Sequence, residues 1–345
     1  MDRQLLWNRR LATLALGLAL LVVALGGWTR LNDAGLGCPD WPGCYGQLTV
    51  PMAEQQLQQA EALYPHAPVD IHKGWLEMVH RYAAGILGLL VMALAVMAWK
   101  QRAVAHYPWR ATLALAGLII VQALFGMWTV TLKLLPLVVT LHLLGGLLTL
   151  SLLFCLRMRL QHLAADSVPV RSTSEVVAGR RWVMAGLLLL FLQLAMGGWT
   201  SSNYAGWACT DWLQCNPQSE IEPDFGAAFE LFPGVGANYE GGHLPVEARA
   251  AIQISHRVVA LLLLGYVALL YWRFAGRSAT GSAVGWVGLL TLVQAVLGIA
   301  NVKLALPLAL ATAHHLGAVA LLVAMLWLYE RVGKETQEVG HGKNA

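Results

Sequence analysis

Eight apolar runs of about 20 residues divide the 345-residue chain, and each run is long enough to cross a hydrocarbon core of about 30 Å as a helix. Charged residues make up 12% of the chain and the mean hydropathy is +0.58, whereas a soluble domain carries about 25% charged residues. We predict transmembrane helices at residues 11–29, 74–99, 110–130, 137–156, 182–200, 252–272, 283–301 and 307–329. The sequence therefore predicts an all-α integral membrane protein with eight transmembrane helices.

The basic residues are unevenly placed between these runs. Sixteen of the 23 Lys and Arg residues precede the first run, follow the last one, or lie in the connections 100–110, 157–181 and 273–277. The positive-inside rule places these segments in the cytoplasm. Both termini are then cytoplasmic, and the long loops at about 30–73 and 201–251 face outward. The net charge of +4 forms no basic stripe, so no nucleic-acid partner is expected.

One segment of the chain occurs twice. Residues 26–44 read GGWTRLNDAGLGCPDWPGC and residues 197–215 read GGWTSSNYAGWACTDWLQC, with 11 of these 19 positions identical at an offset of 171. Later segments match as well, VQALFG at 121–126 with VQAVLG at 293–298. A unit duplicated in this way indicates a scaffold built around two related sites.

The duplication divides the chain into two halves of four runs each. We predict an N-terminal half at 1–160, a cytoplasmic linker at 161–179, a C-terminal half at 180–330 and a cytoplasmic tail at 331–345. Because four is an even number, both halves enter the membrane in the same direction. The predicted architecture is therefore two parallel-repeat four-helix bundles.

Four of the eleven histidines stand inside apolar runs at matching places in the two halves: His80, His142, His256 and His314. Ionisable groups inside a membrane are costly and usually face a functional site, although a hydrogen-bonded structural histidine is the simpler alternative. Each lies about 6–8 residues from the outward end of its run, roughly 10 Å deep at 1.5 Å per residue, so all four share one layer. Two histidines at one depth on different helices suit the axial positions of a haem, whereas zinc uses three or four protein ligands. We predict one haem per half.

His315 is the alternative to His314 as a ligand, because the two are neighbours that point about 100° apart on a helix. The segment LPLVVTLHLLGG at 135–146 matches LPLALATAHHLGAV at 306–319, with one extra residue between proline and histidine in the second copy. Aligning Gly145 with Gly317 pairs His142 with His314, which favours His314.

Arginine follows a candidate ligand in both copies, at Arg81 and Arg257. A guanidinium within a membrane needs a counter-ion, and haem propionates would supply one. The alternative is that each arginine extends to the lipid interface. We predict that both contact propionates.

Two cysteine pairs, Cys38 with Cys44 and Cys209 with Cys215, lie in the outward loops, where disulfides persist. Four cysteines allow three connectivities, and the duplication favours one local bridge per copy, Cys38–Cys44 and Cys209–Cys215. A structural role in closing the loop and a redox role are both open.

The two halves differ at residue 77. The first reads Glu77-x-x-His80, whereas the second reads Gln253-x-x-His256. Positions i and i+3 share a helix face, so Glu77 lies one turn outward of His80. A carboxylate there costs about 2.5–3.5 kcal/mol, and the second copy indicates that an amide fits the same fold. We therefore predict a functional role for Glu77, with a solvated interfacial carboxylate as the alternative.

Taken together, these motifs resemble the haem A synthase family, membrane enzymes that convert haem O into haem A. The resemblance covers nearly the whole chain: eight runs in two halves, two outward cysteine pairs, Glu-x-x-His-Arg in the second run, and one histidine in each even-numbered run. The loop at 201–251 departs from the pattern, because it has no partner of equal length in the first half.

The resemblance implies an activity and a role for each histidine pair. The C8 methyl of haem O would be oxidised to a formyl group by successive hydroxylations, which gives haem A for cytochrome c oxidase. The substrate haem would lie between His80 and His142, and a haem b cofactor between His256 and His314. Glu77 is then the candidate catalytic residue, for proton transfer or for stabilising positive charge at the methyl carbon.

The resemblance also implies a setting, the lipid of the bacterial cytoplasmic (inner) membrane, with haem O synthase and oxidase assembly factors as partners and a homo-oligomer as one option. Two other function classes are open. A di-haem electron-transfer protein would leave Glu77 unexplained. A membrane thiol oxidoreductase would use the cysteines but would leave the four buried histidines unexplained.

Overall fold

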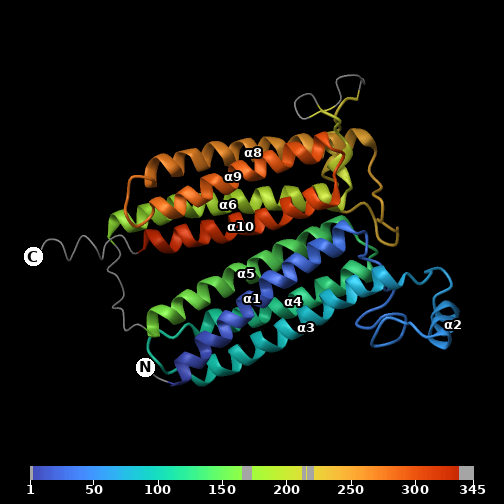
Figure 1. The fold of residues 1–345 in the computed structure, drawn as a ribbon, viewed down its shortest axis with the longest axis horizontal. Helices are drawn as coiled ribbons and strands as arrows, with labels where there is room; N and C mark the ends of the chain where they lie inside the picture. The colour runs from blue at the N-terminus through green and yellow to red at the C-terminus, as the bar shows by residue number, and fades with distance from the viewer. Residues whose placement is uncertain (1–2, 165–172, 212–214, 216–220, 334–345) are drawn as a thin grey trace, which may run out of the picture. The chain divides into compact units, whose positions relative to one another are not determined.

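The computed structural model describes residues 3–164, 173–211, 215 and 221–333, and helices make up most of this part of the chain (Figure 1). The long helices are α1 (Arg3–Leu31), α3 (Ile71–Lys100), α4 (Trp109–Thr131), α5 (Pro136–Ala164), α6 (Ser174–Ser202), α8 (Val246–Phe274), α9 (Gly281–Lys303) and α10 (Leu308–Val332). All eight are long and apolar enough to cross a membrane. Seven predicted runs lie wholly inside one helix, and the eighth begins at Pro307, one residue before α10. The predicted all-α fold with eight membrane-spanning helices is confirmed.

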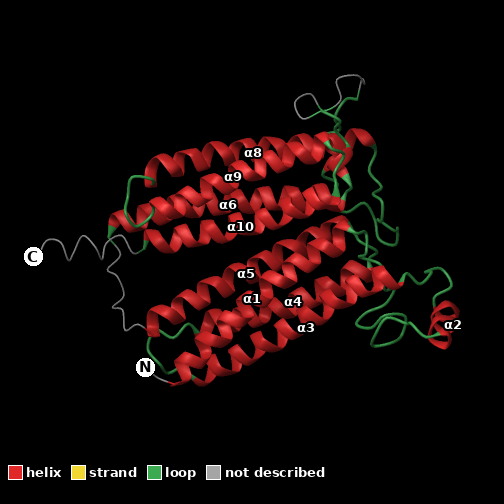
Figure 2. Cartoon of the chain, in the orientation of Figure 1, coloured by secondary structure: helices red, strands yellow, loops and turns green. Residues whose placement is uncertain are grey.

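Three short elements lie in the loops that follow α1 and α6. They are α2 (Glu54–Leu63), the 3-10 helix η1 (Ala205–Trp207) and α7 (Phe225–Ala228). The residues that the structure describes contain no β-strand (Figure 2), only isolated bridges from Cys44 to Gln47 and from Asp211 to Cys215. Each bridge therefore ends at or beside a cysteine of the duplicated motif.

The chain divides into two compact units. The first comprises residues 1–161 together with 201–204 and 229–245, and the second comprises 162–200, 205–228 and 246–345. The sequence did not anticipate that parts of the second long loop belong to the first unit. Within the predicted linker and tail, residues 165–172 and 334–345 lie outside the described residues.

In the first unit, small residues and short polar contacts bring the helices together. The Thr29 hydroxyl in α1 donates a hydrogen bond to the Leu76 carbonyl oxygen in α3, at 3.1 Å. A side chain on Gly146 in α5 would begin 4.0 Å from Val23 in α1, so these two helices are also neighbours. Asp70 caps α3, because its carboxylate accepts the Lys73 backbone N–H at 3.0 Å.

In the second unit, Gly186 sets the approach of α6 to its neighbours. A Cβ there would lie 2.7 Å from Met325 Cε in α10 and 3.1 Å from Leu270 Cδ1 in α8. Because a Cβ there would force the Met325 and Leu270 side chains to shift, glycine allows α6 to pack this closely.

The turns that join α4 to α5 and α9 to α10 have the same backbone conformation. Lys133 and Leu134 have φ of 49° and 62°, and Ala305 and Leu306 have φ of 56° and 60°. These equivalent residues differ by 172 in number, as do His142 and His314. The second half therefore has no inserted residue between the turn and the histidine. Instead, the proline stands one position earlier relative to the turn: Pro136 begins α5, whereas Pro307 precedes α10.

Candidate functional site

His80 in α3 and His142 in α5 lie close together in the first unit. Their ring centroids are 6.4 Å apart and the ring planes are inclined by 87°. The Nδ1 atoms of both rings are buried and have no hydrogen-bond partner among the described residues. The sequence-predicted pair is thus brought together, with buried nitrogens that are left for another ligand.

Each of these imidazoles rests against a glycine of a neighbouring helix. A Cβ on Gly26 in α1 would lie 2.8 Å from His80 Cε1, and a Cβ on Gly126 in α4 would lie 3.4 Å from His142 Cε1. A larger residue at Gly26 would displace the His80 ring. The sequence analysis did not assign these glycines a role, although both belong to the duplicated segments.

The second unit repeats this arrangement. His256 in α8 lies against Gly197 in α6, where a Cβ would be 3.5 Å from its Cε1 atom. His314 in α10 lies against Gly298 in α9 at the corresponding distance of 3.6 Å. Because His314 and His142 both face the glycine that closes a VQALFG-type segment, the contacts support His314 over His315 as the equivalent of His142.

The first pair fits bis-histidine ligation of a haem iron. A bond from a metal to an imidazole nitrogen is about 2 Å long, so two nitrogens on opposite sides of one ion are about 4 Å apart and the ring centres are farther apart still. The observed 6.4 Å between ring centroids agrees with that spacing. The described residues contain no group of three or more His, Cys, Asp or Glu side chains suited to a metal ion.

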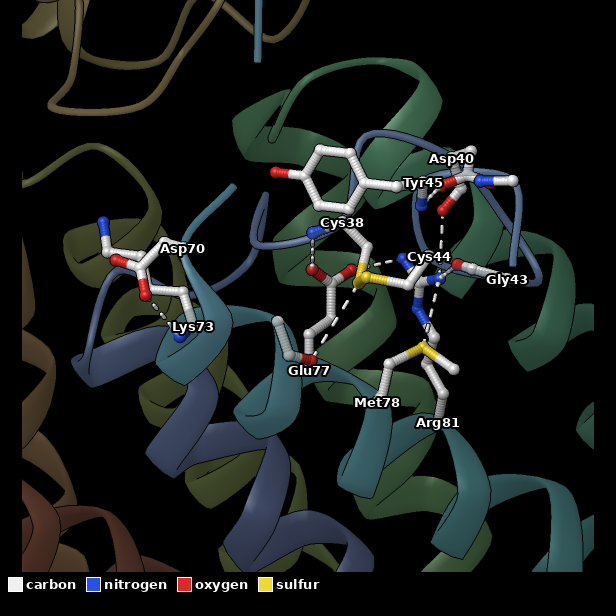
Figure 3. The surroundings of a disulfide bond; sticks show 12 residues. Cys38, Asp40, Gly43, Cys44, Tyr45, Asp70, Lys73, Glu77, Met78 and Arg81 are labelled. Carbon is white, nitrogen blue, oxygen red and sulfur yellow. Dashed lines mark hydrogen bonds and ion pairs between the residues drawn. A yellow bond between two sulfur atoms is a disulfide. The ribbon is translucent and has the colours of Figure 1, made fainter. Parts of the chain in front are cut away.

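Glu77 lies beneath the first cysteine loop (Figure 3). Its side chain is 6% exposed, its Oε2 atom accepts the Cys38 backbone N–H at 2.9 Å, and its Oε1 atom forms an ion pair with Nη2 of Arg81. The carboxylate therefore connects α3 to the loop, directly and through the arginine.

Arg81 binds backbone carbonyl groups of the same loop. Its Nη1 atom donates to the Asp40 oxygen at 2.9 Å and also to the Gly43 oxygen. In the second unit, Nη1 of Arg257 donates to the Asp211 oxygen, again at 2.9 Å. Since Asp40 and Asp211 are equivalent at an offset of 171, the duplicated arginines hold their cysteine loops in the same way. Their contact with propionates stays a prediction.

Gln253 also anchors the second loop, but its side chain donates the hydrogen bond, whereas the side chain of Glu77 accepts one. The Nε2 atom of Gln253 donates to the Gly206 carbonyl oxygen at 3.1 Å, whereas Glu77 accepts from the Cys38 N–H. Counted over the whole residue, Glu77 and Gln253 are each 5% exposed. Anchoring a loop is thus common to residues 77 and 253, and the negative charge is what distinguishes Glu77.

The two predicted local disulfides are both present, Cys38–Cys44 and Cys209–Cys215. Cys38 and Cys44 are 0% exposed, and they pack in an apolar cluster with Tyr45. Burial raises the pKa of the Tyr45 hydroxyl, and nearby carboxylates raise it further. The phenol therefore stays protonated and donates to the Pro68 carbonyl oxygen at 3.0 Å. The first disulfide is enclosed by its own loop together with Trp75 and Met78 of α3.

Residues 229–245, which follow α7, complete the outer end of the first unit. Tyr239 is 4% exposed, packs against Leu134 and Val138, and donates its backbone N–H to the Lys133 oxygen at 3.0 Å. Nearby, Lys73 forms an ion pair with Glu240 at 3.7 Å. A segment from the second half of the sequence is thus built into the unit that contains His80 and His142.

These features define a class of protein: a multi-pass helical membrane protein with duplicated histidine sites beneath disulfide-closed loops. The chain belongs to the cytochrome oxidase assembly protein family COX15-CtaA, whose model matches residues 9–326. It is 40% identical over 326 residues to a haem A synthase of Shewanella oneidensis, a match that covers 94% of this chain and 95% of the relative. Haem A synthases of Caulobacter vibrioides and Rhizorhabdus wittichii are 30% and 29% identical, with 90% of this chain covered in each case and 92% and 89% of the relatives.

Proposed function

We propose that the protein is an oxidoreductase that converts haem O into haem A, by oxidising the C8 methyl of haem O to a formyl group through successive hydroxylations. The Shewanella oneidensis haem A synthase aligns with this chain over 95% of its own length. The observation that carries the proposal is the pair of matched histidine sites of which one alone has a carboxylate above it, Glu77 in place of Gln253. A pure electron carrier would not need that difference.

We assign the substrate, haem O, to His80 and His142, and a haem b cofactor to His256 and His314. When bound, haem b supplies a one-electron redox group. The glycines beside the four rings would fix the directions in which the imidazoles point, and the apolar helices would exclude water from both sites.

Glu77 is the candidate catalytic residue. Its carboxylate would stabilise positive charge that develops at the methyl carbon or would take up a proton released there. Arg81 holds the carboxylate in place through their ion pair. We assign Arg81 and Arg257 to the haem propionates, since the guanidinium group has five N–H donors in a planar fork that suits a carboxylate.

Product formation tests this function. Co-expression of the protein with haem O synthase should yield haem A, detected by mass in haems extracted from the membrane. An inactive control carries His80→Ala and His142→Ala together. If both haem sites fill and neither haem A nor hydroxylated haem O forms, the protein is an electron carrier and the proposal is wrong.

We place the protein in the bacterial inner membrane with both termini in the cytoplasm, and we assign the disulfides a structural role. One labelling series tests both points in a Cys155→Ala background. A maleimide that cannot cross membranes should label Leu48→Cys in intact cells, since Leu48 is 84% exposed on the first outer loop. Arg102→Cys should be labelled only after permeabilisation, and the reverse pattern would invert the topology.

The same series measures access to the disulfides. Treatment with an impermeant reductant should leave the four loop cysteines unlabelled in the folded protein, because their exposure ranges from 0% to 8%. Denaturation in detergent with reductant should expose all four thiols. Rapid labelling of Cys38 and Cys44 in the folded state would instead support a redox role, as a thiol oxidoreductase requires.

A further inference from the structure

Gln193 in α6 is a polar side chain directly beside a candidate haem ligand. Its Nε2 atom lies 3.3 Å from both ring nitrogens of His256. Its Oε1 atom is buried and has no hydrogen-bond partner among the described residues. An amide within an apolar helix is costly unless it is hydrogen-bonded. The position of Gln193 therefore calls for a specific partner.

The first unit has no such side chain, and His80 has a hydrogen bond with the Val22 backbone instead. At the offset of 171 that relates α1 to α6, the residue equivalent to Gln193 is Val22. Other polar neighbours are shared: Gln122 lies against Gly145 in the first unit, just as Gln294 lies against Gly317 in the second. The two sites thus differ in the side chain beside the histidine, which is Gln193 in one unit and Val22 in the other. They also differ in the side chain that anchors the loop, Glu77 or Gln253.

Ligand chemistry gives the amide a definite role. A histidine that binds a metal through one ring nitrogen almost always donates the N–H of the other to an acceptor, which fixes the ring and raises its basicity. A half-turn of the Gln193 amide exchanges its oxygen and nitrogen. The unpartnered Oε1 then lies where Nε2 lies now, 3.3 Å from both ring nitrogens of His256, so it can accept a proton that Nδ1 carries. That orientation satisfies both the amide oxygen and the imidazole N–H.

We propose that Gln193 is a positioning residue for His256: its amide oxygen accepts the Nδ1 proton and directs Nε2 toward the iron of the cofactor haem. The inference rests on the proposed haem b site. A more basic imidazole binds iron more tightly and stabilises its oxidised form. The cofactor site would then retain its haem, while His80, beside Val22, would hold a substrate haem that must leave as product.

The test uses a His80→Ala, His142→Ala background, in which one haem site is left. Gln193→Leu removes the acceptor and places an apolar side chain where the first unit has valine. Gln193→Glu keeps the shape and strengthens the acceptor. The readouts are the transfer of haem b to excess apomyoglobin and the midpoint potential. Val22→Gln is the matched control, made at the equivalent position of the first unit.

We expect Gln193→Leu to lower haem affinity about 10- to 100-fold, the usual effect of losing such a partner, and to raise the midpoint potential. Gln193→Glu should shift the potential downward, and Val22→Gln should leave it unchanged. Shifts in the same direction for Leu and Glu, or no shift for either, would overturn the inference. If instead His256→Ala retains the haem b spectrum, the cofactor assignment itself is wrong, so the two failures are distinguishable.

Discussion

Purified His256→Ala protein is expected to lack the low-spin spectrum of haem b that the proposed cofactor site predicts for the unmodified protein. The reason is the loss of one of the two proposed axial ligands from α8, a helix that contains no other histidine. Alanine at this position also opens space beside Gly197, so the cavity would admit water in place of the ring. The measurement is the reduced-minus-oxidised absorption spectrum, normalised to protein.

Two companion variants make this result specific. His80→Ala should keep the haem b spectrum and lose haem A formation, because it removes a ligand from the substrate site alone. His315→Ala should keep both, because His314 and not His315 occupies the place of His142 against a glycine. An unchanged spectrum in His256→Ala, or its loss in His315→Ala, would contradict the ligand assignment.

Replacing Glu77 with glutamine is expected to lower the rate of haem A formation by about 10²- to 10⁴-fold, the range attributed to a group that transfers a proton in the transition state. The fold should persist, because Gln253 occupies the equivalent place and holds its loop through Gly206. The measurement is the rate of product formation at equal haem b content. Gln253→Glu is the matched comparison: added to Glu77→Gln, it should not restore the rate, because its carboxylate lies in the other unit and cannot donate to the Gly206 oxygen.

The structure supplies an alternative reason for a slow Glu77→Gln enzyme, which the same protein can test. Glu77 anchors the Cys38 N–H and pairs with Arg81, and breaking a buried ion pair by removing one partner costs about 3–5 kcal/mol. If the loop opened for that reason, Cys38 and Cys44 would become accessible to reductant and maleimide. Slow catalysis with unlabelled cysteines supports a catalytic carboxylate, whereas slow catalysis with labelled cysteines assigns Glu77 to the loop.

Apolar length alone was sufficient to predict the helices, because no other structure satisfies the backbone of such runs within a bilayer. The duplication was sufficient to pair the cysteines, whereas its choice among the histidines stays a prediction. His80 and His142 lie together in the structure, as their equal depth predicts. Sequence patterns of this kind carry information about depth and helix face.

Other parts of the site depend on contacts that a pattern does not encode. Gly26 leaves room for the His80 ring, because a Cβ there would lie 2.8 Å from it. The spacing of apolar residues in a sequence does not reveal such a distance. Arg81 was expected at a propionate, yet it donates to loop carbonyl groups, because the loop folds back over α3. Gln193 was overlooked because one amide in an apolar helix carries no signal until the equivalent Val22 is compared with it.

Residues 229–245 have a consequence for the order in which the protein folds during synthesis. Domains made early usually fold first, as the ribosome adds about 5–20 residues per second. Here the helices of the first unit are complete by Ala164, but Tyr239 seals the turn at Leu134 only after α6 and α7 have been made. The outer end of the N-terminal unit is therefore finished late, and the nascent protein must keep that apolar turn protected until the closing segment arrives.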